Sequence, residues 1–350
     1  MSIRLLLSLL ATPFQGPIDH LPHATVTVDR DRKELIIELP AVDLEPASEP
    51  GGLTMAEPPV CQAVLPIDAW LVGYHVEVLD TAGHRLPQSM LHHFNLTDPL
   101  RRDLFAHLPL HLLAASKETQ SIKIPWLLLG MPVVRGQHVL ASGMAANYWP
   151  RAAPGVRLRL VLSYVPARRP WPLFSAYPWS MDVMFPLGQP GDGTKGFDLP
   201  PGRTERSWES SPAIAGKIIG LSGHVHDHVR SLELKDVTTG QVIWYAEPIR
   251  DSAGIVSTMP VARFYKWNSL GIRIDPGHRY RVTVVYENPT GQVIHRGGMG
   301  AVAGLFVPAR GARWPGVDPA DSVYRQGLSI EMRNSGERMS DMMMMEHRHR

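Results

Sequence analysis

The sequence is short of cysteine, and this scarcity excludes several kinds of site. Among 350 residues there is one cysteine, Cys61. A disulfide within the chain, a C-x-x-C zinc site and an iron–sulfur cluster are therefore excluded. Any metal site has to use histidine, methionine or carboxylate ligands, and the chain has 16 histidines and 15 methionines to supply them.

The chain also lacks a strong net charge and a membrane-spanning run. A formal net charge of +2 supplies no field for holding nucleic acid or an anionic membrane, so we expect no nucleic-acid partner. The apolar run at 5–14 has the length of a signal-peptide core and is far shorter than the roughly 20 residues of a transmembrane helix. We interpret residues 1–24 as a secretory leader or a short N-terminal anchor. We expect a protein exported to the periplasm or the extracellular space, held at the membrane if the leader is not cleaved.

Long helical patterns are scarce, and 32 prolines oppose them. One segment, 98–116, has a local helical pattern, and Pro109 interrupts it. Short segments in which apolar and polar residues alternate dominate instead, and turn signals separate them; this pattern is typical of half-buried strands. The sequence therefore predicts an all-β fold built from sandwiches.

A stretch rich in proline and arginine at 166–173 has no strand periodicity and marks a domain boundary. We expect a first β-sandwich over residues 25–166 and a second over residues 167–310. The strand pattern fades beyond Ala309, so residues 311–350 form a C-terminal extension. Its end, 342–350, is rich in Met and His and is either a soft-metal capture tail or a disordered end.

The sharpest local feature is the H-x-H motif His224-Val225-His226 at the start of the predicted second sandwich. Residues i and i+2 of a strand share one face about 7 Å apart, so the two imidazoles can converge on one ion. Neutral imidazole suits copper, zinc, iron or nickel. His228 shares the face as a third ligand or a bystander. The alternative is a solvated strand face that carries three histidines.

A second feature, His92-His93, lies late in the first sandwich. Neighbouring residues of a regular strand point to opposite faces, so this pair can share an ion only where the backbone bulges or turns. Without a bulge, one histidine is buried and the other is exposed.

A third feature is Met299 in the Gly-rich segment His295-Arg296-Gly297-Gly298-Met299. A thioether is a soft ligand that selects Cu(I). The alternative is that Met299 fills a gap in the core.

The order of these motifs resembles the copper type II, ascorbate-dependent monooxygenases, which include peptidylglycine α-hydroxylating monooxygenase and dopamine β-monooxygenase. The likeness spans approximately residues 25 to 310. It consists of an HH pair in a first lobe, an H-x-H motif opening a strand in a second lobe, and a His followed by Gly-Gly-Met near its end.

The resemblance implies two consecutive jelly-roll-like antiparallel β-sandwich domains with one mononuclear copper ion on each, reduced by ascorbate. It implies that His224, His226 and Met299 hold the copper that activates dioxygen. It also implies that His92 and His93 supply two of the three ligands of an electron-relay copper.

The third relay ligand departs from the family pattern. The family places that His in a strand that reads V-H-Y, and the counterpart here is Ala146-Asn147-Tyr148, with Asn147 at the ligand position. His138, nine residues earlier, is the alternative ligand. Asn is a poor ligand for Cu(I), which leaves a two-coordinate or empty relay site open.

Two functions follow from the resemblance. The first is an oxidoreductase, a copper-dependent monooxygenase that hydroxylates an activated C–H bond of a small-molecule or peptide substrate with dioxygen and ascorbate. The alternative is a non-catalytic relative, either an exported copper-binding module or a structural subunit docked on a larger, membrane-bound protein complex. Asn147 in place of a ligand His favours the alternative.

Overall fold

The computed structural model describes residues 18–47, 53–117, 121–168, 172–185, 196–252, 254–266 and 269–333. The apolar core of the predicted leader, 5–14, and the Met- and His-rich tail, 342–350, lie outside these residues.

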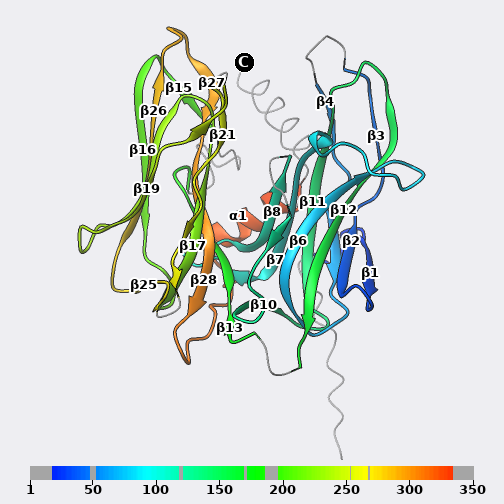
Figure 1. Cartoon of the computed structure of the whole chain (residues 1–350), viewed down its shortest axis with the longest axis horizontal. Helices are drawn as coiled ribbons and strands as arrows, with labels where there is room; N and C mark the ends of the chain where they lie inside the picture. The colour runs from blue at the N-terminus through cyan, green and yellow to red at the C-terminus, as the bar shows by residue number, and fades with distance from the viewer. Residues whose placement is uncertain are drawn as a thin grey trace, which may run out of the picture.

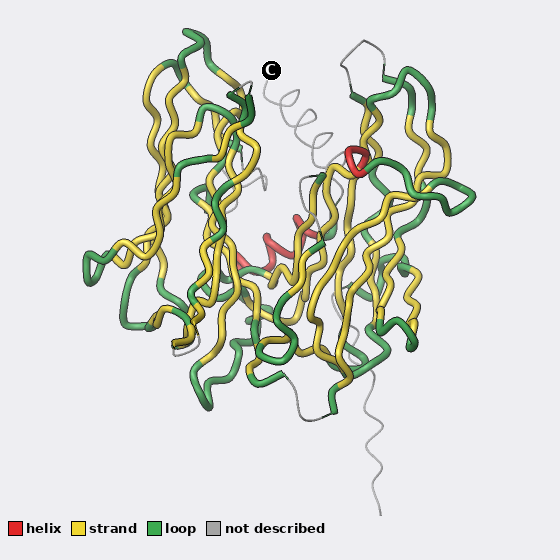
Figure 2. The backbone as a smooth tube through the Cα atoms, viewed as in Figure 1, coloured by secondary structure: helices red, strands yellow, loops and turns green. Residues whose placement is uncertain are grey.

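The described chain folds into two antiparallel β-sandwiches that stand beside each other (Figure 1), and strands account for most of its regular structure (Figure 2). The predicted fold class, all-β with two jelly-roll-like sandwiches, is confirmed. Within the described ranges the regular helices are the 3-10 turn η1 (Gln88–Met90) and the α-helix α1 (Ser322–Glu331). Neither is long and apolar enough to cross a bilayer.

The first sandwich packs an eight-stranded sheet on a five-stranded sheet. The larger sheet contains β1 (Thr25–Asp29), β2 (Glu34–Glu38), β12 (Ala153–Pro166), β6 (Ala69–Leu79), β10 (Leu129–Val133) and β13 (Phe174–Ser175), with β3 (Val42–Leu44) and β9 (Ile122–Lys123) beside β12 and β6. The smaller sheet contains β4 (Thr54–Ala56), β11 (His138–Asn147), β7 (Leu91–Arg102) and β8 (Pro109–Ser116), with β5 (Cys61–Val64) beside β11.

The second sandwich packs a five-stranded sheet on a four-stranded sheet. The first of these contains β14 (Tyr177–Asp182), β28 (Gly300–Pro308), β17 (Gly216–Val225), β22 (Ala262–Arg263) and β25 (Ile272–Ile274); the second contains β16 (Gly202–Ser210), β26 (Tyr280–Asn288), β18 (Val229–Asp236) and β19 (Val242–Ala246). Two-stranded ribbons join β15 (Phe197–Leu199) to β27 (Ile294–Gly298), β20 (Ile249–Arg250) to β21 (Val256–Thr258), and β23 (Tyr265–Lys266) to β24 (Ser269–Leu270).

Strict alternation of burial explains why these segments form strands. In β26 every second residue from Tyr280 to Asn288 is buried, and the residues between them are half-buried. In β2 the buried residues are Leu35 and Ile37. Each such side chain contributes roughly 1.5–3 kcal/mol by leaving water, so the period of two that marks the sequence also fills the two cores.

The predicted local helix at 98–116 is wrong. Its first residues continue β7 as far as Arg102, and its last residues form β8, which pairs with β7 in antiparallel register. Pro109 is the first residue of β8, a position where the missing N–H of proline costs no ladder hydrogen bond. The tertiary pairing therefore outweighs the local helical pattern.

The turn between β7 and β8 joins the two sandwiches. Leu104 and Phe105 leave the first sandwich and are buried in the core of the second, where the Phe105 ring lies 5.4 Å from that of Trp179. Phe105 also offers its carbonyl to the Ser210 hydroxyl of β16 at 2.8 Å. The Asp103 carboxylate accepts from the backbone N–H of Ser180 in β14 at 3.3 Å. The lobes are thus held together by apolar packing and by hydrogen bonds.

Helix α1 returns to the first sandwich. Asp321 caps its N-terminus by accepting from the backbone N–H groups of Val323 and Tyr324. Tyr324 and Leu328 are buried together with Ile18, Val60 and Leu140. The predicted C-terminal extension therefore packs on the first lobe, although it follows the second lobe in the chain.

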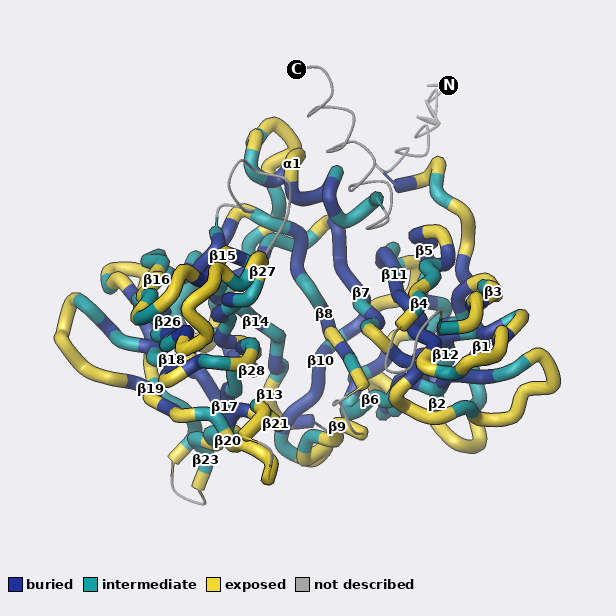
Figure 3. Tube along the Cα trace, turned by 90° about the horizontal axis from the view of Figure 1, so that it is seen from above, coloured by how far each residue is buried: buried dark blue, intermediate teal, exposed yellow. Residues whose placement is uncertain are grey.

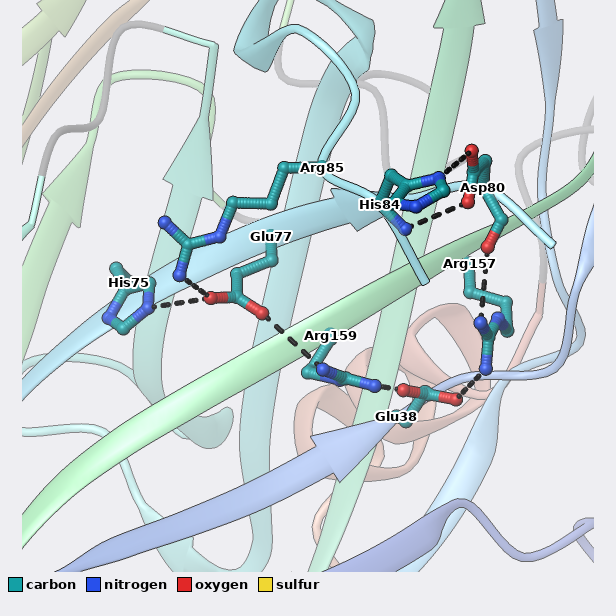
Figure 4. Close-up of polar contacts among 8 residues, drawn as sticks. All are labelled: Glu38, His75, Glu77, Asp80, His84, Arg85, Arg157 and Arg159. Carbon is teal, nitrogen blue, oxygen red and sulfur yellow. Dashed lines mark hydrogen bonds and ion pairs between the residues drawn. The ribbon is translucent and has the colours of Figure 1, made fainter. Parts of the chain in front are cut away.

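A ladder of alternating charges crosses β2, β12 and β6 of the first sandwich (Figure 4). Glu38 accepts from Arg157 at 3.0 Å and from Arg159 at 2.7 Å. Arg159 in turn lies 3.6 Å from Glu77, which also contacts Arg85. Cross-strand pairs of opposite charge contribute roughly 0.2–1 kcal/mol each, so the ladder helps to fix the register of these strands.

Candidate metal sites

His224 and His226 lie together at the C-terminal end of β17 and just beyond it. Leu221 and Val225 are buried in the core of the second sandwich, so the two histidines point to the other face of the sheet. That face is turned toward the first sandwich (Figure 1, Figure 3). Their ring centroids are 5.8 Å apart. An ion lies about 2 Å from a ligating imidazole nitrogen, so two rings that share one can have centroids at most about 6.5 Å apart. The pair meets this condition.

Met299 lies at the neighbouring strand, directly before β28. The register pairs His224 with Ala301 and Val225 with Gly300. Continued by one residue beyond β17, the same register brings Met299 opposite His226. Gly300 is required here, because a Cβ at this position would lie 2.7 Å from the side chain of Val284 in the core. The close approach at Gly300 leaves Met299 on the far side of the strand from the core.

A buried tyrosine hydroxyl joins His226 and Met299. The Tyr286 hydroxyl accepts from the backbone N–H of His226 and from that of Met299, both at 3.0 Å, and donates to the Met299 carbonyl. Burial raises the pKa of Tyr286, so the hydroxyl keeps its proton for this bond. One side chain therefore fixes the backbones of two residues that lie 73 positions apart in the sequence.

Sequence reasoning missed Tyr286. It lies in the alternating run that predicts β26, where a buried tyrosine reads as core. A buried tyrosine hydroxyl requires a polar partner, which is a signal of its position, but the sequence does not say which backbone it meets.

The other histidines of this region are placed differently. His228 has a left-handed backbone, with φ of 69°, and its carbonyl accepts from the Glu287 backbone N–H. His295 is exposed, with its Nδ1 3.2 Å from the Asp198 carboxylate. The hydrogen bonds to Arg296 N–H and His295 hold the pKa of Asp198 below its usual range.

His92 and His93 lie on a β-bulge. His93 pairs with Met144 of β11, but the next pair along the strand joins Leu91 to Ala145, so His92 is the extra residue. Leu91 and Phe94 are both buried in the core, although they are three positions apart. The two histidines between them therefore both leave the core. Their ring centroids are 5.5 Å apart, which again allows a shared ion.

The side chain of Asn147 is hydrogen-bonded to three surrounding backbone groups. It is fully buried at the end of β11, its Nδ2 donates to the carbonyls of Glu45 and Arg151, and its Oδ1 accepts from the Trp149 N–H. All three bonds are 2.8–2.9 Å long. With both amide donors and the carbonyl oxygen engaged, Asn147 has a structural role in closing this turn.

His138 lies at the opposite end of the same strand. It pairs with Val64 of β5, and Met144, the partner of His93, lies six positions further along β11. Six strand residues span roughly 20 Å. The structure does not bring His138 to the His92–His93 pair.

In the part of the chain that the structure describes, no three His, Cys, Asp or Glu side chains gather closely enough to hold a metal ion. Methionine is not among these residue types, so Met299 beside His224 and His226 falls outside that statement.

No protein-family description matches this chain. No curated protein matches it in sequence. Among solved structures it is similar to a chain of Sulfolobus turreted icosahedral virus, with 9% identity, a TM-score of 0.18, and coverage of 78% of this chain and 59% of that one. It is also similar to the VP2 subviral particle of infectious bursal disease virus, with 13% identity, a TM-score of 0.23, and coverage of 86% and 75%. Values this low transfer no property of those proteins to this chain.

Proposed function

We propose that this chain binds a copper ion at His224, His226 and Met299 and hydroxylates an activated C–H bond of a small-molecule or peptide substrate with dioxygen and ascorbate. The observation that supports this proposal is the Tyr286 hydroxyl, which ties the backbones of His226 and Met299 together. A set of two imidazoles and one thioether suits copper in its reduced state.

The roles of the side chains follow from their places. His224 and His226 would act as neutral ligands, so binding is expected to weaken where imidazole is protonated. Tyr286 is a positioning residue, because its hydroxyl is engaged with backbone atoms. A copper ion bound here would supply one-electron chemistry toward dioxygen. His224 is exposed, so a substrate can reach the site from solvent.

The test is copper content, copper EPR and ascorbate-dependent oxygen consumption for the wild type beside the double variant His224→Ala/His226→Ala. His84→Ala is the matched control, because His84 is an exposed histidine of the other sandwich. We expect the double variant to lose one copper per chain and the oxygen consumption, and the control to lose neither. Oxygen consumption that survives the double substitution would sink the proposal.

A second candidate is a non-catalytic protein, an exported copper-binding module or a structural subunit of a larger complex. The observation in its favour is that Asn147 is engaged with backbone atoms and His138 is remote, so neither completes a relay site with His92 and His93. Copper bound at His224 and His226 without any ascorbate-dependent oxygen consumption would support this candidate. Stoichiometric co-purification with partner proteins would favour the structural subunit.

A further inference from the structure

We propose that Met144 completes a separate copper site in the first sandwich, together with His92 and His93. The proposal rests on the proposed function in its choice of copper, whereas the side-chain placement is independent of the second lobe.

The face of β11 decides where Met144 points. A Cβ at Gly143 would lie 2.8 Å from the side chain of Leu158 in the core, so position 143 faces inward. The neighbouring Met144 then faces outward, on the same side of the sheet as its partner His93. The bulge adds His92 to this side, as the burial of Leu91 and Phe94 shows.

The separation of these side chains suits one ion. Directly opposed residues of antiparallel strands have Cβ atoms about 4.5–5.5 Å apart, which is the relation of His93 to Met144. The ring centroids of His92 and His93 are 5.5 Å apart. Exposure increases from Met144, which is 8% exposed, through half-buried His93 to exposed His92. The thioether therefore lies deepest and His92 lies toward solvent.

The chemistry of the three donors selects the metal. Two imidazoles and a thioether form a soft set that favours Cu(I) over the hard cations and over zinc, which prefers thiolate, imidazole and carboxylate. The set has the same composition as His224, His226 and Met299. Met144 takes the place that the resemblance gives to a third histidine, three residues before Asn147 on the same strand.

The test uses the full-length chain with His224→Ala/His226→Ala introduced and with Met342–Met345, His347 and His349 replaced by serine, so that neither the second sandwich nor the Met- and His-rich end supplies copper ligands. Cu(I) is titrated in competition with a chromophoric Cu(I) chelator, and X-ray absorption at the copper edge reports sulfur ligands. Met144→Leu removes the thioether at nearly constant volume. Met131→Leu is the matched control, because Met131 is 9% exposed and lies in the core of the same sandwich.

We expect the background protein to bind one Cu(I) per chain with a copper–sulfur contribution. Met144→Leu should lose that contribution and weaken binding at least about tenfold, since even loss of a group that supports a ligand costs 10–100-fold. Met131→Leu should change neither quantity. Met144→His should retain copper without sulfur, which keeps the test valid if the Leu variant folds poorly.

Two results would overturn the proposal. One is a background protein that binds no Cu(I), while the wild type still loses one copper in the double variant; the copper proposed for the second sandwich would then survive alone. The other is unchanged affinity and sulfur contribution in both Met144 variants.

Discussion

The two sandwiches close corresponding turns with the same residue. At the end of β26, Asn288 donates from Nδ2 to the carbonyls of Leu199 and Gln292 and accepts at Oδ1 from the Thr290 N–H. Asn147 at the end of β11 makes the same three bonds, to a distant carbonyl, to the carbonyl four residues on, and to the N–H two residues on. The repetition shows that Asn147, like Asn288, has a structural role in closing its turn.

The largest expected effect comes from substituting these asparagines. Asn147→His would restore a ligand if position 147 belonged to a metal site. We expect it instead to lower the free energy of unfolding by about 3 kcal/mol or more, because three hydrogen bonds to buried backbone groups are lost. Asn288→His should do the same. Copper content and urea unfolding of both variants check this expectation; a copper ion gained only by the Asn147 variant would break the comparison.

The sequence predicts some of these features and misses those that depend on contacts between distant residues. Alternating burial predicts both sandwiches because it depends on the period of neighbouring residues, as in β26. The predicted helix at 98–116 fails because pairing of β8 with β7 is a contact that local pattern does not contain. His92 and His93 can share an ion only if the backbone bulges between them, and the structure has such a bulge. The sequence does not predict the bulge, because it depends on how β7 pairs with β11. The structural role of Asn147 is likewise absent from the sequence pattern, because the Glu45 carbonyl that it binds lies 102 positions away.

The lobes differ two residues before each asparagine. There the second sandwich has Tyr286, whose hydroxyl holds the proposed copper site, and the first has the buried Ala145. We expect Tyr286→Phe to lower the free energy of unfolding by about 1–3 kcal/mol and to weaken copper binding at His224 and His226.

Tyr280→Phe is the control for that substitution. Tyr280 is buried six positions earlier on the same strand, and its hydroxyl accepts from the Asp275 N–H instead of from His226. It should cost stability without changing copper affinity. Equal copper affinities in the two variants would contradict a positioning role for Tyr286.

Each lobe has a glycine that allows a neighbouring edge strand to lie close to the strand that contains the glycine. A Cβ at Gly73 of β6 would lie 2.6 Å from the Ile122 carbonyl of β9, and one at Gly220 of β17 would lie 2.9 Å from the Ala262 carbonyl of β22. We expect Gly73→Ala and Gly220→Ala to cost about 1–3 kcal/mol each, with the larger loss at Gly73. Gly316→Ala, where nothing lies within 4 Å, should be nearly neutral. Thermal unfolding of the three variants tests this order of stability losses. A Gly73 variant as stable as the wild type would show that β9 can shift to make room for the added methyl group.

The smallest expected effect separates two buried aspartates that have similar hydrogen-bond partners, although Asp98 also pairs with Arg101. Asp98 accepts from the N–H of Leu100 and from Gln137, which directly precedes β11; Asp236 accepts from the N–H of Thr238 and from His278, which precedes β26. Burial raises the pKa of Asp98. Burial also opposes ionisation of Asp236, but the hydrogen bonds from His278 and Thr239 outweigh it and lower its pKa.

These opposite shifts predict opposite pH dependences. A raised pKa contributes stability at low pH that is lost as pH rises from the ordinary aspartate value through the folded one, whereas a lowered pKa contributes stability that is lost as pH falls below the ordinary value. Relative to wild type, Asp98→Asn should therefore gain stability with rising pH in the window above about 4, and Asp236→Asn should lose it with rising pH in the window below. Urea unfolding from pH 3 to pH 6 gives both slopes, and slopes of one sign would show that the two carboxylates do not differ between the lobes.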